Sequence, residues 1–193
     1  MTKILVVATG NPGKLREMQA YLADSGWELR LKPEDLEVEE TGVTFAENAS
    51  LKASEIAKIT GNWAIADDSG LAVDALNGAP GVYSARYGNS DTERITRLLT
   101  ELGEEKNRQA KFVCAIAVAN PQGEIIIQSE GICEGEILFA PSGDGGFGYD
   151  PIFYVPEKQL TFAQMTTDIK KSISHRGNAL RALVPQLKKV LNW

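Results

Sequence analysis

The sequence is poor in the residues that usually build metal and disulfide sites. Its 193 residues include one histidine and two cysteines. Zinc sites normally draw on several such ligands, and a disulfide framework normally has more cysteines. We therefore exclude the usual zinc sites. We expect Cys114 and Cys133, which lie in strand-like segments, to be free core thiols of a cytoplasmic protein.

Long apolar runs and an excess of positive charge are also missing. No apolar stretch approaches the roughly 20 residues that a membrane-spanning helix needs. The net charge of −6 argues against a general electrostatic grip on nucleic acid. The N-terminus carries one lysine and a short apolar run, which is typical of a buried strand and not of a signal peptide. We expect no membrane and no nucleic-acid partner.

What is present indicates an α/β fold, with helices flanking a mixed central sheet. A hydrophobic content of 43% is enough for a sizeable core, or for two lobes in a single domain over residues 1–193 without a linker. The apolar pattern predicts strands at 3–8, 63–66 with 71–73, 111–119 and 124–137, and helices from 12, at 44–60, at 90–102 and from about 172–174. Pro185 lies within the last helical pattern, so we expect a kink or break near Val184.

The segment Thr9-Gly10-Asn11-Pro12-Gly13-Lys14 joins the first strand to the first helix. Asn11 suits the N-cap and Pro12 the first helical position. The spacing is too short for a P-loop, and Leu15 replaces the serine or threonine that would hold magnesium. The segment is either a helix start that binds an anion beside Lys14, or an ordinary turn.

Two acidic pairs lie near polar turns. Asp67-Asp68 follows an apolar run at a strand end, where neighbouring side chains point to opposite faces, so one could face a site and the other the scaffold. Glu39-Glu40 precedes a Thr-Gly turn. Carboxylates from separate loops are ligands that magnesium takes when it also binds phosphate, although acids usually lie on the surface. Lys52, on the inward stripe of its helix, either reaches such a site or snorkels to solvent.

Two further segments contain candidate binding residues. Residues 143–148 match G-x-G-x-x-G, but no clear strand precedes them and no helix opens after them, so we reject a dinucleotide site. With Phe147 and Tyr149, this loop is either a wall that stacks on a base or a flexible turn. Ser174-His175-Arg176-Gly177 contains the single histidine at a helix start, and is either an anion or nucleotide site or a solvated cap.

Taken together, seven segments resemble the inosine triphosphate pyrophosphatase family, whose members are house-cleaning enzymes that hydrolyse non-standard purine nucleoside triphosphates. Each segment is weak alone, but their order is specific, and they extend over nearly the whole chain. The segments are 8–14, 39–49, 51–53, 65–71, 78–86, 145–150 and 174–177.

The resemblance implies a two-lobed α/β fold with the substrate in the cleft between the lobes, usually as a homodimer. It implies hydrolysis of a nucleoside triphosphate to the monophosphate and pyrophosphate, with one or more magnesium ions per subunit. It also implies ITP, dITP and XTP as the preferred substrates.

Matching motif positions assign roles to individual residues. Glu40 and Asp68 would bind the metal, Asp68 would accept the proton of the attacking water, and Lys52 would be the second catalytic residue. Phosphates and sugar would be held by Thr9, Gly10, Asn11, Pro12, Gly13, Lys14, Lys52 and Ser69. The base would be read by Phe147, Gly148, Tyr149, Asp150, Lys170, His175 and Arg176. Spacing to the Ser-His-Arg motif favours Lys170 over Lys171.

The residue types agree with this chemistry. A carboxylate can take the proton of water, and lysines can relieve charge on leaving pyrophosphate. Donors such as His175 and Arg176 would pair with a 6-oxo group, and buried donors left unpaired by a 6-amino group can reject adenine by roughly 10⁴-fold. Two other hypotheses are a nucleotide-binding sensor without turnover, and a pyrophosphatase for pyrimidine or modified bases.

Overall fold

The structure is a computed structural model that describes residues 3–191, and its chain forms two compact units. Unit 1 is formed by the described parts of Met1–Asp68, Cys114–Gly131 and Arg176–Trp193, and unit 2 by Ser69–Val113 and Ile132–His175. The prediction of one domain without a linker stays a prediction, and its first and last two residues lie outside the described range.

The strands are β1 (Ile4–Val7), β2 (Glu28–Leu31), β3 (Trp63–Val73), β4 (Gln109–Ala119), β5 (Ile125–Ile137), β6 (Phe153–Val155) and β7 (Leu160–Thr161). The helices are α1 (Pro12–Leu22), α2 (Phe45–Thr60), α3 (Asp91–Leu102), α4 (Thr167–Ile173) and α5 (His175–Leu191).

The strands form a mixed sheet, as the sequence predicted. Their order is β2-β1-β3-β4-β5-β6-β7. β1 pairs in parallel with β2 and β3, whereas β6 pairs antiparallel with β5 and β7. The residues of β3, β4 and β5 are divided between the two units, so each of these strands contributes to both.

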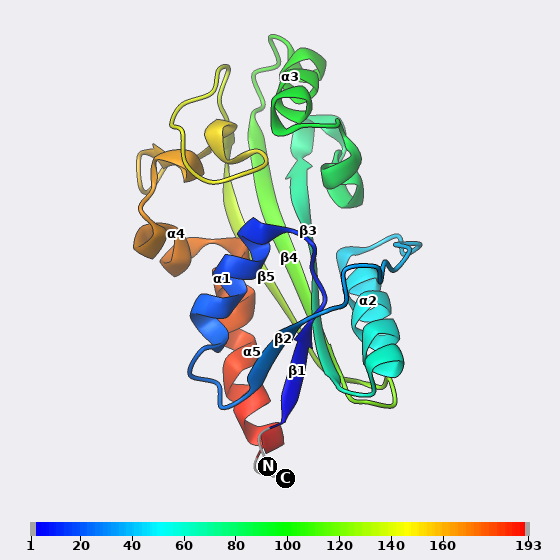
Figure 1. Cartoon of the computed structure of the whole chain (residues 1–193). Coiled ribbons are helices and arrows are strands. Elements are labelled where there is room, and N and C mark those ends of the chain that lie inside the picture. The colour runs from blue at the N-terminus through cyan, green and yellow to red at the C-terminus, as the bar shows by residue number, and fades with distance from the viewer. Residues whose placement is uncertain (1–2, 192–193) are drawn as a thin grey trace. The chain divides into compact units, whose positions relative to one another are not determined.

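In unit 1, side chains of the strands alternate between two buried faces. Leu5, Val7 and Ile65 belong to a core cluster with residues of α1 and α5. Val6 and Ala64 belong to a second cluster with residues of α2. Figure 1 shows α1 and α5 on one side of β1 and β3, and α2 on the other. A strand covered on both faces reads as a continuous apolar run, which is why the sequence predicted β1 correctly.

Small side chains bring α2 close to the sheet. Ala49, Ala53 and Ala57 on the helix are buried against sheet alanines such as Ala66 and Ala117. A capping box between Thr44 and Glu47 starts the helix, and Gly61 ends it in the left-handed conformation at φ 64°. The close approach places the polar residues of the same helix within reach of β3.

In unit 2, an aromatic cluster forms the centre of the core. The ring of Phe112 stacks on that of Phe162 at 5.6 Å and meets Phe153 edge-on at 4.6 Å. Apolar residues of β3 and of α3 complete this core. These ring contacts stabilise the core of unit 2 beyond the burial of apolar area.

Several features of the fold differ from the sequence prediction or were not predicted, and β2, β6, β7 and α4 are among those not predicted. α5 runs from His175 to Leu191 with Pro185 inside it, so the helix does not break near Val184, and the alternative of a kink there stays a prediction. Buried leucines of α5 on both sides of the proline, Leu183 and Leu187, hold the helix against unit 1. β2 was missed because it is short, and its Glu-Leu-Arg-Leu sequence leaves three of its four residues exposed.

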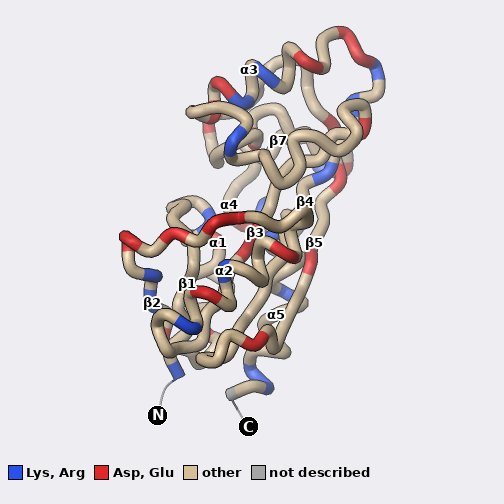
Figure 2. Tube along the Cα trace, turned by 90° about the vertical axis from the view of Figure 1, so that its right-hand side faces the viewer, with Lys and Arg blue, Asp and Glu red and all other residues tan. Residues whose placement is uncertain are grey.

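Two further features of the fold are the distribution of its charged residues and the hydropathy of its helices. Figure 2 shows acidic and basic residues interspersed over most of the trace. Within residues 3–191, none of the helices combines the length and the apolar character required to span a bilayer.

Both cysteines are expected to resist labelling in the native protein. Burial raises the pKa of the Cys114 thiol to about 12 and that of Cys133 to about 11. Since the thiolate is the reactive form, a thiol reagent at pH 8 should modify neither residue until the protein unfolds. Labelling followed by absorbance, with and without denaturant, checks this. Rapid labelling of native protein would contradict the burial of these thiols.

Candidate active site

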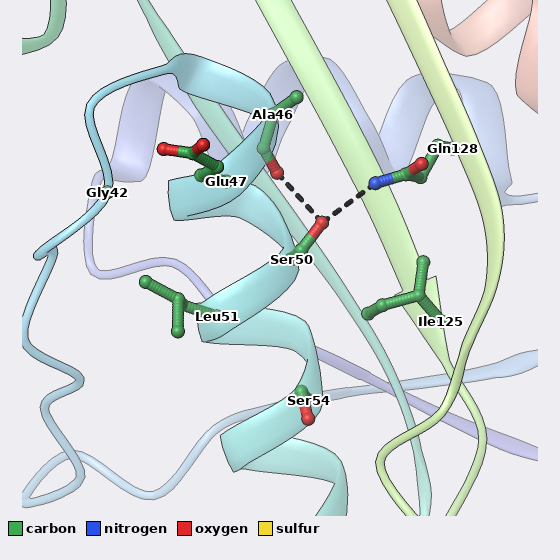
Figure 3. A pocket seen from close by; sticks show the side chains of 8 residues that line it. All are labelled: Gly42, Ala46, Glu47, Ser50, Leu51, Ser54, Ile125 and Gln128. Atoms are coloured by element: carbon green, nitrogen blue, oxygen red, sulfur yellow. Dashed lines mark hydrogen bonds between the residues drawn. The ribbon is translucent and has the colours of Figure 1, made fainter.

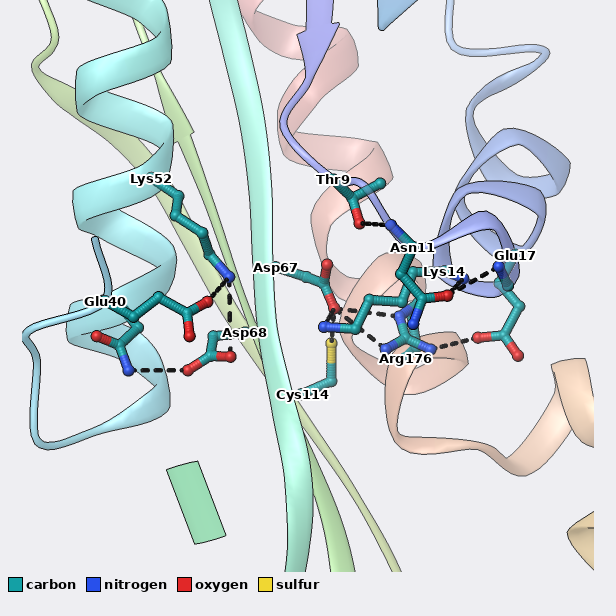
Figure 4. A network of polar contacts seen from close by, with 12 residues as sticks. Thr9, Asn11, Lys14, Glu17, Glu40, Lys52, Asp67, Asp68, Cys114 and Arg176 are labelled. Carbon is teal, nitrogen blue, oxygen red and sulfur yellow. Dashed lines mark hydrogen bonds and ion pairs between the residues drawn. The ribbon is translucent and has the colours of Figure 1, made fainter. Parts of the chain in front are cut away.

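Strand β3 separates two polar clusters of unit 1. The sequence predicted Asp67-Asp68 at a strand end, whereas the structure places the pair inside β3, because both carboxylates have charged partners that permit burial. Asp67 is 1% and Asp68 is 5% exposed. The expected alternation is confirmed, because Figure 4 shows Asp68 directed toward α2 and Asp67 toward Lys14 and Arg176.

The first cluster unites the two predicted metal ligands with Lys52. The Lys52 ammonium lies 2.6 Å from Glu40 Oε1 and 3.8 Å from Asp68 Oδ1. Asn48, one helical turn before Lys52, donates a hydrogen bond of 3.1 Å to Asp68 Oδ2. Lys52 therefore contacts an acidic site and does not simply extend to solvent.

Asn48 also fixes the loop that carries Glu40. Its side-chain oxygen accepts a hydrogen bond of 2.8 Å from the backbone N–H of Gly42. A Cβ at Gly42 would lie only 2.7 Å from that oxygen, so this position requires glycine. One buried amide thus orients both the loop of Glu40 and the carboxylate of Asp68.

Burial and charge change the proton affinities of this cluster. Burial raises the pKa of Asp68 above its ordinary value, and Lys52 and Lys14 oppose this effect without cancelling it. The pKa of Lys52 is raised because neighbouring Asp67, Asp68 and Glu40 outweigh the opposing effect of burial. A carboxylate with a raised pKa beside a protonated lysine is suited to accept a proton.

The donor set of this cluster fits a hard divalent cation. Glu40 and Asp68 come from separate segments, yet both carboxylates contact the same ammonium group. Magnesium is commonly held by one or two carboxylates, with water and substrate phosphates completing its shell. Among residues 3–191, no group of three or more His, Cys, Asp or Glu side chains forms a metal site. Two carboxylates are sufficient for an ion that also binds phosphate.

The strand-to-helix turn has the geometry that the sequence predicted. Asn11 caps α1, and its side-chain oxygen accepts hydrogen bonds from Gly13 N and Lys14 N at 2.9 and 3.2 Å. Thr9 Oγ1 accepts a hydrogen bond from Asn11 N at 3.1 Å. Pro12 is the first helical residue, and Gly10 is exposed. The turn is therefore pre-formed, with Lys14 in the first turn of the helix.

The second cluster lies on the α1 and α5 side of β3. Asp67 Oδ2 lies 3.0 Å from Lys14 Nζ and 3.1 Å from Arg176 Nη2. Arg176 is 1% exposed, and its other terminal nitrogen contacts Glu17. Burial alone would raise the pKa of Asp67, but Lys14 and Arg176 hold it well below its usual range. The predicted phosphate ligand and the predicted base reader in unit 1 thus share one carboxylate.

In unit 2, Asp150 organises the predicted base-reading loop. Its Oδ2 accepts hydrogen bonds from Phe147 N at 2.9 Å and Lys170 Nζ at 2.7 Å. The Lys170 ammonium lies 4.8 Å from the centroid of the Phe147 ring. A Cβ at Gly146, whose φ is 76°, would lie 2.0 Å from Asp150 Oδ2. The glycine-rich loop is therefore ordered around a buried carboxylate, which is not the arrangement of a flexible turn.

The remaining predicted residues of unit 2 are held by further contacts. His175 stacks on Phe112 at 4.7 Å between ring centroids. Tyr149 is buried, and its hydroxyl donates a hydrogen bond of 2.8 Å to Ser84 O. Gly148 N donates a hydrogen bond of 2.7 Å to Asp91. Ser69 directly follows Asp68 in β3. The division into units falls between His175 and Arg176.

A groove of about 480 Å³ lies along α2 and β5 of unit 1. Figure 3 shows Ser50 hydrogen bonded to Gln128 across it. None of its eight lining residues is a predicted substrate contact. Its lining residues are Gly42, Ala46, Glu47, Ser50, Leu51, Ser54, Ile125 and Gln128.

Sequence reasoning missed two polar residues that organise these clusters, and it missed the partners of a third. Asn48 lies four residues before Lys52, and Glu17 lies three residues after Lys14, so each shares a helix face with a predicted residue. That spacing was the available signal. The third residue, Asp67, was noticed as half of an acidic pair, but its partners are distant in the sequence and could not be identified from it.

Comparisons with known proteins agree over nearly the whole chain. A protein from Nostoc sp., named dITP/XTP pyrophosphatase, is 73% identical over 192 residues, which cover 100% of this chain and 98% of that protein. One from Synechocystis sp. with the same name is 60% identical and covers 94% of each. The Staphylococcus aureus Ham1 protein has a similar structure, with a TM-score of 0.87 and 44% identity over 97% of this chain and 99% of that one. The model of the Ham1 family matches residues 5–186. This chain therefore belongs to the Ham1 family.

Proposed function

We propose that this protein hydrolyses dITP, ITP and XTP to the monophosphate and pyrophosphate. The observation that supports this proposal most strongly is that a relative named dITP/XTP pyrophosphatase is 73% identical over all of this chain. The cluster of Glu40, Lys52 and Asp68 supplies groups that such a reaction requires. The reaction removes non-standard purine nucleotides from the nucleotide pool.

Asp68 is the group that accepts the proton of the attacking water. Burial raises its pKa, which increases its basicity, and the hydrogen bond from Asn48 fixes its orientation. Asp68 would hold magnesium together with Glu40, and the ion would lower the pKa of bound water and neutralise charge on phosphate oxygens. The Ser-His-Asp type of covalent catalysis is not needed.

Lysines and backbone groups of unit 1 stabilise the leaving pyrophosphate. Lys52 is in contact with Asp68, and Lys14 lies in the first turn of α1. The segment Thr9–Gly13 and the start of α1 favour negative charge, as helix N-termini do. Positive charge held in place before the reaction stabilises the charge that develops on the leaving group.

The groups proposed to read the base include three residues of unit 2 that contact one another. Phe147 offers an aromatic face, and Lys170 with Asp150 offers a donor and an acceptor. The family resemblance also assigns His175 and Arg176 as donors for the 6-oxo group of hypoxanthine or xanthine. Ser69 would contact the phosphates or sugar. We further propose a homodimer, as the family resemblance implies, and a location in the cytoplasm, as the free cysteines indicate.

The reaction is tested by product analysis. We expect incubation with ITP or XTP and magnesium to release pyrophosphate and the monophosphate, ATP to react far more slowly, and EDTA to abolish turnover. Release of orthophosphate and a nucleoside diphosphate would show that the protein cleaves a different phosphoanhydride bond from the one that we propose. Tight ITP binding without any product would favour a nucleotide sensor.

Lys52→Met should lower kcat much more than it changes KM. The variant removes a positive charge near the predicted leaving group, and losing one such group costs roughly 10²-fold in kcat. Steady-state kinetics with ITP measure the two constants separately. Lys58→Met, an exposed lysine on the same helix, is the control. An unchanged kcat would contradict the leaving-group role.

A further inference from the structure

Asp67 is a buried charge that the proposed mechanism does not use. It is 1% exposed, and its Oδ2 receives Lys14 Nζ at 3.0 Å and both Arg176 Nε and Nη2, at 3.3 and 3.1 Å. Its Oδ1 has no hydrogen-bond partner within the described residues. A buried carboxylate with this many cationic contacts on one oxygen joins segments that are far apart in the sequence.

We propose that Asp67 is a positioning residue, which sets the places of the Lys14 ammonium and the Arg176 guanidinium for the triphosphate and the base. This inference rests on the proposed function. It adds a second task to the acidic pair of β3. Asp68 acts on the substrate, whereas Asp67, one residue earlier and on the opposite face, acts through its two cationic partners.

The geometry favours positioning for two reasons. Lys14 has a long and flexible side chain, but one end of it is held by Asp67 and the other by the first turn of α1, which Asn11 caps. The Arg176 guanidinium is held at three nitrogens, two by Asp67 and one by Glu17. A planar guanidinium fixed in this way has one orientation.

Charge balance supports the same role. Two cations and two carboxylates face one another in this cluster, since Lys14 and Arg176 meet Asp67 and Glu17. Without the charge of Asp67, Lys14 loses its ion pair with Asp67 Oδ2, and Arg176 loses the contacts of Nε and Nη2 with that oxygen while its contact with Glu17 remains. We therefore expect loss of the Asp67 charge to lower the affinity for substrate as well as the stability of the protein.

A double-mutant cycle with Lys14 tests the proposal. Asp67→Asn should lower kcat/KM for ITP by about 100-fold, mainly by raising KM, because losing one partner of a buried charge pair has effects of this order. In a Lys14→Met background the same substitution should cost only about 10-fold, since the part of its effect that acts through Lys14 is already lost and only the part through Arg176 remains. Asp24→Asn, at an exposed position of unit 1, is the matched control and should leave both constants unchanged.

Asp67→Glu distinguishes the positioning of the two cations from the mere presence of a negative charge near them. It keeps the charge but moves the carboxylate by one methylene, so it should restore most of kcat/KM while KM stays above that of the wild type. If Asp67→Asn does not fold, the cycle with Lys14 is measured with Asp67→Glu. Equal effects with and without Lys14, or wild-type KM in both Asp67 variants, would overturn the proposal.

Calorimetric binding of pyrophosphate and ITP in EDTA gives a readout that needs no turnover. If wild-type protein releases no pyrophosphate from ITP, the proposed function fails, and weaker binding of these ligands by Asp67→Asn still supports the positioning role. Unchanged binding in that variant, or no binding by the wild type, overturns the positioning role.

Discussion

Asp68→Asn is expected to lower kcat for ITP by about 10³-fold or more. The substitution removes the proton acceptor of the proposed reaction and a ligand of the divalent cation, and loss of a general base alone costs roughly 10² to 10⁴-fold. The side chain keeps its size and can still accept the hydrogen bond from Asn48. Pyrophosphate release at saturating ITP and magnesium measures the loss.

The same variant should be at least as stable as the wild type without metal. Burial raises the pKa of Asp68 in the folded protein. For a carboxyl group with a raised pKa, stability falls as the pH rises above the unfolded value, because the unfolded state loses its proton first. Asparagine removes this cost at pH 7. Thermal unfolding in EDTA should therefore show an unchanged or higher Tm, as expected where a site has been kept for activity at the expense of stability.

Two results would count against this assignment. A variant that keeps more than about a tenth of wild-type kcat would show that Asp68 is not the base. A large fall in Tm would mean that ionised Asp68 stabilises the fold through Lys52, and inactivity would then have a structural cause. Asp24→Asn again serves as the control for loss of one acidic residue.

The sequence predicted local structure best where one rule governs each position. Asn11, Pro12 and the Thr44–Glu47 capping box mark helix starts through contacts within four residues. The continuous apolar run of β1 follows from burial on both faces. By contrast, Pro185 does not break α5, because the packing of this helix in the unit 1 core outweighs the missing backbone donor.

The candidate site shows the same division between local and distant contacts. The alternation of Asp67 and Asp68 follows from strand geometry and was predicted from two adjacent letters. The partner of Asp67 on α5, Arg176, lies 109 residues away, and no periodicity connects them. The family resemblance supplied what local rules could not, since it named Glu40, Lys52 and Asp68 together. The membership of the family is confirmed by the comparisons, whereas the roles of these residues stay predictions.

Arg176→Met is expected to lower the free energy of unfolding by about 3–5 kcal/mol, the usual cost of leaving one partner of a buried ion pair. Arg176 is 1% exposed, and Asp67 beside it would keep the ion pair with Lys14 and the contact with the Cys114 thiol. Urea denaturation at a fixed protein concentration measures the change. In Asp67→Asn/Arg176→Met the cost should be smaller than the sum of the single variants, because no buried charge of this pair is then left alone.

This stability measurement decides how Arg176 takes part in base selection. If Arg176→Met is unstable and also narrows the ratio of kcat/KM between ITP and ATP at temperatures where it stays folded, Arg176 both anchors the cluster and reads the base. If it is unstable and the ratio is unchanged, Arg176 is an anchor, and discrimination against the 6-amino group belongs to the donors of unit 2, Lys170 and His175. If it is as stable as the wild type, the contacts with Asp67 and Glu17 contribute no net stability, and the guanidinium can be released to substrate at little cost.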